Sequence, residues 1–214
     1  MKNPEHSVPQ HWAVRFFTIW TGQAFSLFGS ALVQFALIWW LTEKTGSAVV
    51  LTMATLVGML PQVVLGPFAG AVVDRGNRRL IMMLADGSIA AFTLLLAWLF
   101  VTGQVQVWHV YVILAIRALG GAFHFPAMSA STPLMVPEKH LTRISGMNQT
   151  LQGLMAMIAP PVGAMLIGVL STQGVLMIDV VTAAIAILPL FFFNVPQPER
   201  KVREAHEEKP SLLS

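Results

Sequence analysis

The residues best able to do chemistry in this sequence are a few charged side chains separated by long uncharged stretches. Four of them fall within ten residues, in GAVVDRGNRR at 70–79, whereas the 29 residues from Thr45 to Val73 carry no charge. Three more, Asp86, Arg117 and Asp179, interrupt apolar runs farther along the chain. A carboxylate can accept hydrogen bonds or a proton, and a guanidinium can hold a carboxylate. What these groups do depends on whether water or hydrocarbon surrounds them.

The composition indicates that hydrocarbon surrounds most of the chain. Of the 214 residues, 55% are hydrophobic and only 11% are charged, whereas soluble domains carry about 25% charged residues. A soluble protein of this size has too few polar groups to cover so much apolar surface. The sequence has no cysteine, so no disulfide or thiolate chemistry is expected. The polar N-terminus, MKNPEHSVPQHW, lacks the apolar core of a signal peptide.

Six apolar stretches are long enough to cross a membrane as helices, which takes about 20 residues each. Membrane-spanning strands are excluded because they alternate over ~10 residues, which these runs do not. Beyond Phe125 we expect the fourth helix to kink and pass into a loop over AMSASTPLMVP at 127–137. The sequence thus predicts an all-α, polytopic bundle of six transmembrane helices, at Phe16–Leu41, Ala48–Val73, Leu80–Val101, Val107–Phe125, Ile144–Leu170 and Val175–Phe193.

The positive charges predict how the bundle faces the membrane. With both termini on one side, 11 of the 13 Lys and Arg residues lie on that side, Lys44 lies opposite and Arg117 lies within a span. Because cytoplasmic loops are enriched in Lys and Arg, we expect both termini in the cytoplasm and the protein in the cell membrane. We expect three regions: a cytoplasmic segment at 1–14, the transmembrane domain at 15–194, and a charged tail or linker at 195–214.

Orientation alone would need only cations, so it explains neither Asp74 nor Gly70, one helical turn before it. The run Gly70-Ala-Val-Val-Asp74-Arg75-Gly76-Asn77-Arg78-Arg79 resembles the signature loop between helices 2 and 3 of the major facilitator superfamily. Asn77 stands where that family usually has a second glycine, and asparagine tolerates left-handed backbone angles. A glycine at position 70 would let another helix come close.

Two further stretches resemble motifs of the same superfamily, in the same order along the chain. Ile113-x-x-x-Arg117-x-x-x-Gly121 looks like its second motif, with Gly120 in place of the usual glutamine. APPVGA at 159–164 looks like a weakened form of the helix 5 motif of proton-driven antiporters. The sequence over about residues 12–195 as a whole is similar to the macrolide-efflux branch of this superfamily.

The resemblance implies a fold and a function. The superfamily builds two six-helix halves from inverted three-helix repeats, and twelve spans need roughly 400 residues. The chain therefore looks like an N-terminal half, working in drug efflux by alternating access. A proton gradient would supply the energy, with no bound cofactor. The implied partners are membrane lipid, a small amphipathic substrate, and a second six-helix half or a homodimer partner, with no nucleic acid.

The resemblance also assigns roles to the charged residues. The signature-loop residues would form a gate on the cytoplasmic side, partly against the other half, although solvated charges that set only topology would give the same sequence. The gate residues are Gly70, Asp74, Arg75, Arg78 and Arg79.

An arginine near mid-membrane costs about 2.5–3.5 kcal/mol to insert, so Arg117 needs a partner or a watery cavity. The resemblance implies that Arg117 couples proton binding to substrate release; alternatively it is a structural cation held by carbonyls or a carboxylate. Asp86 and Asp179 are candidates for binding the proton, but both lie near helix ends and would also suit the membrane interface. His124, on the face of Arg117, would either titrate or pack as a neutral ring.

A polar stripe runs along the first predicted helix, because Gln23, Ser26, Ser30 and Gln34 recur at spacings of 3, 4 and 4. In lipid such a stripe must face protein or water. It is interpreted as one wall of a substrate cavity, with Trp20 and Phe16 on or near the same side, or else as a set of interhelical hydrogen bonds.

In the fifth predicted helix, Pro160 and Pro161 each remove a backbone donor and should bend the helix, so that with Gly163 they would form a hinge.

The sequence gives no reason to expect an enzyme or a metal site. It contains no HExxH, no GxSxG, no phosphate-binding loop and no cluster with metal-ligand spacing. Two alternatives to drug efflux stay open. In the first, the chain is a carrier for another small molecule. In the second, it is a truncated membrane protein with no transport activity of its own.

Overall fold

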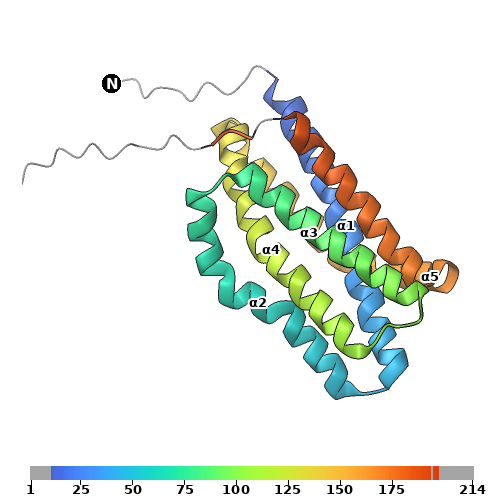
Figure 1. Ribbon diagram of the computed structural model, residues 1–214. Coiled ribbons are helices and arrows are strands. Elements are labelled where there is room, and N and C mark those ends of the chain that lie inside the picture. The colour runs from blue at the N-terminus through green and yellow to red at the C-terminus, as the bar shows by residue number, and fades with distance from the viewer. Residues whose placement is uncertain (1–10, 194, 198–214) are drawn as a thin grey trace, which may run out of the picture.

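The structure is a computed structural model that describes residues 11–193 and 195–197. Residues 1–10, 194 and 198–214, which hold most of the expected N-terminal segment and tail, lie outside the described residues. The helices stand side by side in one bundle (Figure 1). Within the described residues, five helices are long and apolar enough to cross a membrane: α1 (Trp12–Thr45), α2 (Ala48–Arg75), α3 (Arg78–Val101), α4 (Val107–Met135) and α5 (Glu138–Phe192).

Five helical elements stand where six were expected, because the last two predicted spans meet across a kink at Ser171 and form one element, α5. Instead of a loop at 171–174, α5 contains a single non-helical residue, Ser171, with φ 62° and ψ 165°. The chain nevertheless reverses there, since Ile144 and Leu190 belong to the same apolar cluster. A straight helix would separate two residues 46 positions apart by ~70 Å. In Figure 1 the turn lies at the end of the bundle beside the label α5.

The fourth helix is longer than expected. α4 does not give way to a loop after Phe125 but continues through Pro126 and Pro133 to Met135. Ser131 and Thr132 donate side-chain hydrogen bonds to the carbonyls four residues earlier, at 2.6 and 3.1 Å, as hydroxyls do within helices. The small, polar sequence after Phe125 therefore marks a helix that packs against protein, not an irregular segment.

Two apolar clusters occupy the two ends of the bundle and leave a polar layer between them. One contains Phe16, Val73, Met82, Ile144 and Leu190. The other contains residues from the opposite ends of the same helices, such as 37, 41, 96, 110 and 175. Buried polar side chains from α1, α3, α4 and α5 lie between them: Gln23, Ser26, Asp86, Thr93, Arg117 and Asp179.

The end of the bundle around Phe16 and Ile144 also collects the described cations that the sequence placed on one side of the membrane. They lie in the first two turns of α1, α3 and α5 and the last turn of α2, at positions 15, 75, 78, 79, 139 and 143. Lys44 lies at the other end, in the last turn of α1. The fold thus separates the charges along its long axis as the helix order requires.

Ser171 has backbone angles that are favourable almost only for glycine. We expect Ser171→Gly to stabilise the chain by about 1 kcal/mol, because relief of strain outweighs the added flexibility of the unfolded chain. Ser171→Ala is the matched control, since it removes the same hydroxyl but keeps a Cβ. Thermal unfolding of the purified chain in lipid nanodiscs, followed by tryptophan fluorescence, measures both. A midpoint for Ser171→Gly at or below that of Ser171→Ala would contradict the assignment of strain to this residue.

Candidate functional site

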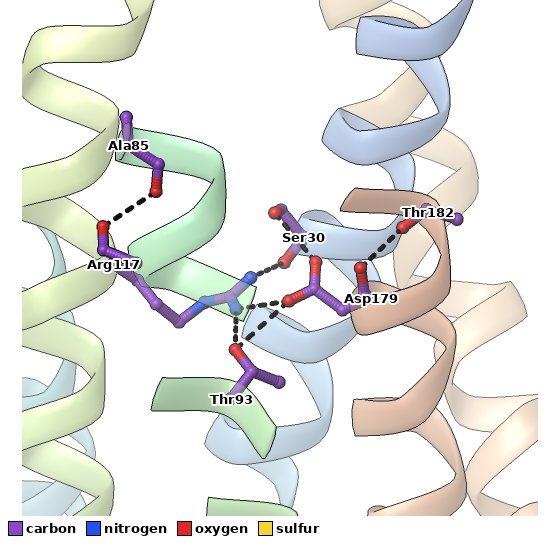
Figure 2. A network of polar contacts seen from close by, with 7 residues as sticks. Ser30, Ala85, Thr93, Arg117, Asp179 and Thr182 are labelled. Carbon is purple, nitrogen blue, oxygen red and sulfur yellow. Dashed lines mark hydrogen bonds and ion pairs between the residues drawn. The ribbon is translucent and has the colours of Figure 1, made fainter. Parts of the chain in front are cut away.

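At the centre of the polar layer, Arg117 and Asp179 form a buried ion pair (Figure 2). Arg117 Nη1 lies 2.6 Å from Asp179 Oδ2 and also donates to Thr93 Oγ1 at 2.7 Å. Thr93 in turn donates to the same carboxylate oxygen at 3.3 Å. Arg117 is 8% exposed and Asp179 is fully buried. Arg117 therefore has the carboxylate partner that its position in the membrane requires.

α1 completes this ion-pair network through Ser30. Its hydroxyl donates to Asp179 Oδ1 at 3.0 Å, and its carbonyl accepts from Arg117 Nη2 at 3.3 Å. α1 comes this close because residue 29 is glycine: a Cβ there would lie 3.1 Å from the Cα of Asp179. The network joins α1, α3, α4 and α5, as Figure 2 shows. Asp179 is therefore an interior residue, and its interpretation as a membrane-interface residue is wrong.

A second polar cluster lies on the same layer and contains Asp86, Gln23 and His124. Gln23 Nε2 donates to Asp86 Oδ2 at 3.2 Å, and Gln23 Oε1 lies 2.8 Å from His124 Nε2. The same histidine nitrogen is 3.5 Å from Asp86 Oδ1. Asp86 is only 5% exposed, so it too belongs to the interior and not to the interface. We refer to these three residues as the Asp86 cluster.

Both polar groups border one cavity of about 190 Å³. All four residues of the α1 stripe line it, as do Gly58 and Gln62 of α2 and Gly121 of α4. Trp20 and Phe16 do not line it: Trp20 donates to Asn148 at 2.7 Å, and Phe16 is buried in an apolar cluster. The stripe therefore faces a cavity and takes part in interhelical bonds at the same time.

Sequence reasoning missed the contributions of Thr93 and Gln62. Thr93 lies seven residues after Asp86, so the two share one face of α3. That spacing would have singled it out within a run of Leu and Ala. Gln62 stands alone in an apolar helix, four residues after Gly58, and the two line the cavity together.

The signature loop is organised around Arg78 more than around Asp74. Arg78 is 7% exposed and donates to the carbonyl of Ala130 at 2.7 Å. Asp74 lies 3.7 Å from it, but its side chain is 73% exposed. Arg79 donates to the carbonyl of Phe191 at 3.0 Å, whereas Arg75 is exposed.

The turn itself differs from the expectation. Asn77 has φ −79° and is not left-handed; instead it caps α3, with its side chain accepting from Leu80 N–H at 3.2 Å. The chain after α5 forms hydrogen bonds with this turn. Gln197 accepts from Arg78 N–H at 3.3 Å and donates to Asn77 Oδ1 at 3.3 Å. Nearby, Val195 is buried in the apolar cluster of this end.

Two predicted features have no partner helix within the described chain. A Cβ at Gly70 would meet no atom within 4 Å, so no described helix approaches there. Pro160 and Pro161 are exposed, and the backbone around them stays helical, with the only break in α5 at Ser171. Gly163 does make a close contact, against the ring of Phe35 in α1. A hinge at the proline pair is therefore not visible in the backbone angles.

A bundle of long apolar helices around a polar cavity, with a buried ion pair between helices, is the architecture of a multi-pass membrane protein. Residues 19–214 match the family model of the Major Facilitator Superfamily, so the chain belongs to this superfamily and is a multi-pass membrane protein in contact with lipid.

Curated relatives narrow the comparison further. Macrolide efflux protein A of Streptococcus pyogenes is 45% identical over 187 residues, which are 87% of this chain and 46% of that protein. Macrolide efflux protein A of Enterococcus faecalis is 41% identical over 152 residues, 71% of this chain and 47% of that protein. Multidrug efflux pump Tap of Mycobacterium bovis is 28% identical over 194 residues. The chain spans about half the length of these relatives, and no solved structure matches it.

The ion pair predicts a characteristic pattern of stability changes. The single variants Arg117→Gln and Asp179→Asn each remove one partner of the pair. Each should destabilise the folded chain by about 3–5 kcal/mol, because the other charge stays buried without compensation. The double variant should lose much less than the sum of the two. Lys44→Gln, at an exposed helix end, is the matched control for loss of a cation. Additive losses, measured by thermal unfolding in nanodiscs, would show that the two charges do not depend on each other.

Proposed function

We propose that the chain is the N-terminal half of an exporter of macrolide-like drugs that works by alternating access. The observation that carries this proposal is a membrane-buried polar cavity lined by all four residues of the α1 stripe. It lies in a chain 45% identical to half of a macrolide efflux protein. In this proposal the cavity wall binds substrate, and the function is transport and not catalysis.

The size of the cavity supports a second half. Pockets for drug-sized ligands usually measure about 300–1,000 Å³, whereas this one measures about 190 Å³. Its lining comes from α1, α2, α3 and α4. We propose that a second six-helix unit, supplied by a C-terminal half or by another copy, encloses the rest of the substrate.

The signature loop is proposed to act as the gate. Arg78 is fixed to the bundle by the Ala130 carbonyl, while Asp74 is largely exposed at the same end. An exposed carboxylate beside an anchored guanidinium is available to pair with groups outside this chain in one transport state and to release them in another. Gly70, which no described helix approaches, would lie at the same junction.

For energy coupling we propose a proton gradient, with no bound cofactor. Arg117 and Asp179 are fully engaged with each other and with Thr93 and Ser30. We assign to this ion pair the structural role of linking four helices. We propose that the pair rearranges when the cavity changes the side of the membrane to which it is open. Asp86, which borders the cavity, is the carboxylate available to exchange protons.

The proposed location is the cell membrane with the cation-rich end in the cytoplasm. The parent chain has no cysteine, so single cysteines report topology directly. Lys139→Cys, at the cation-rich end, should resist a membrane-impermeant maleimide in intact cells and react after permeabilisation. Glu43→Cys, at the opposite end of the bundle, should react in intact cells. Both sites are exposed. The opposite pattern would invert the topology and remove the gate from the cytoplasm.

Drug accumulation tests the proposed activity. Cells expressing the protein should accumulate less labelled macrolide than control cells, and a protonophore should abolish the difference. Arg117→Ala should reduce export about tenfold or more because it breaks the ion pair that links the four helices. Asp74→Asn should reduce export while leaving the thermal stability within about 0.5 kcal/mol, since an exposed ion pair contributes little.

Glu43→Gln is the matched control for loss of an exposed carboxylate and should export like the parent. Accumulation that is unchanged in both the Arg117 and the Asp74 variants would rule out the proposed transport mechanism.

A further inference from the structure

A second hollow in the structure is an apolar groove, which lies apart from the polar cavity. It has a volume of about 790 Å³ and is formed by the last part of α3 and by the residues of α5 around the Ser171 turn. None of the residues that line the groove also lines the polar cavity. In Figure 1 the groove lies at the end of the bundle beside the label α5, where α3 ends and α5 turns back. The groove is therefore not part of the proposed substrate path.

The lining of the groove carries no charged side chain. Its polar side chains, Ser171 and Gln173, both belong to the turn of α5. The walls are large apolar side chains, among them Trp98 and Val101 of α3 and Met177 of α5, which are 55%, 72% and 42% exposed. In a membrane such side chains are stable only against other apolar groups, so the groove is suited to an uncharged, apolar ligand.

The groove exists because small residues alternate with large ones along α3. Ala91, Leu94, Leu95, Trp98 and Val101 line it at spacings of three and four residues, so they form one face of the helix. On the opposite wall α5 contributes a glycine at position 174. The sequence thus leaves one continuous slot between the two helices.

The length of the groove matches one leaflet of a bilayer. The ten steps from Ala91 to Val101 rise about 15 Å along a helix, which is half of the hydrocarbon thickness of about 30 Å. Val101 is the last residue of α3. Trp98 lies in the last turn of the helix, and tryptophan is enriched where a membrane meets water. The groove therefore runs from the membrane boundary towards the middle of the bilayer.

The occupant of this groove follows from its length, its lack of charge and its continuity with the lipid-facing surface of a multi-pass membrane protein. We propose that the groove binds one acyl chain of a phospholipid in the leaflet opposite the cation-rich end. The acyl chain places only CH₂ groups between the apolar walls, and the ester and headgroup lie at the boundary beside Trp98 and Gln173. A protonated drug would lie there without a counter-charge. This inference does not depend on the proposed export function.

A lipid in the groove differs from the lipids around the rest of the bundle. Its acyl chain contacts two helices at once, so it makes more dispersion contacts than a chain on a convex face such as that around Ala184. It should therefore exchange more slowly with the bulk lipid. Because no charged residue lines the groove, binding should depend on the acyl chain and not on the headgroup.

Photolabelling of the purified chain in lipid nanodiscs tests the proposal. The probe is a phosphatidylcholine with a diazirine at the middle of one acyl chain, present as a minor fraction in unlabelled phosphatidylcholine. Mass spectrometry of the digested chain should find the label mainly on residues 91–101 and 170–177. Ala91→Phe, which fills the groove, should lower this labelling about threefold or more. Ala184→Phe is the matched control, since Ala184 is also exposed but lies outside the groove, and it should label like the parent.

A second variant and a second probe complete the test. Trp98→Ala removes one wall without filling the groove, so it should also lower the labelling, and it keeps the proposal testable if Ala91→Phe does not fold. A probe with the same acyl chains and a phosphatidylglycerol headgroup should label as well as the first.

Five results would each overturn the proposal. Three of them are even labelling of all exposed apolar segments, labelling of Ala91→Phe and Trp98→Ala equal to that of the parent, and a preference for one headgroup. The fourth is displacement of the label by excess erythromycin, which would identify a drug as the occupant. The fifth is displacement when two copies share a nanodisc, which would identify a second copy of the chain.

Discussion

The cost of placing charge in hydrocarbon governs this structure. An unpaired arginine or aspartate in the middle of a membrane is unfavourable by several kcal/mol, and the bundle meets that cost by bringing Arg117 of α4 to Asp179 of α5. The pair also takes up a hydroxyl of α3 and both polar groups of Ser30 in α1. Because the partners come from four different helices, satisfying one charge pair fixes the relative positions of these helices.

Close packing of α1 makes this arrangement possible. Gly22 and Gly29 bring α1 against the second part of α5, where a Cβ would lie 3.1 Å from the Ile185 carbonyl and from the Asp179 Cα respectively. The polar stripe of the same helix turns towards the cavity. Small residues on one face and amides and hydroxyls on the other thus give α1 two tasks. It holds the bundle together, and it supplies one wall of the cavity.

Much of this could be predicted from the sequence, because length and hydropathy determine membrane helices almost independently of tertiary contacts. The start of α2, the end of α3 and the start of α4 agree with the apolar runs. The errors arose where local signals mislead. Pro126 and Pro133 suggested a loop, but neighbouring hydroxyls and packed protein sustain the helix. The last two predicted spans are separated by one non-helical residue, Ser171, whereas the polar sequence at 171–174 suggested a loop of four residues.

The site was predictable as a set of residues but not as a set of pairs. The stripe on α1 follows from helical periodicity alone. The choice of Asp179 over Asp86 as the partner of Arg117 depends on interhelical distances that no spacing along one helix encodes. The close approach of Ile89 to Gly120 between α3 and α4 is of the same kind.

The contact of Gln197 with the turn between α2 and α3 has a mechanical consequence. Gln197 bonds both to the residue that caps α3 and to the first backbone N–H of that helix. The last described residues of the chain therefore lie against the signature loop. Tension applied to the chain beyond this point would act directly on the first turn of α3. A tether in this position links whatever follows residue 197 to the same few atoms that hold Arg78 in place.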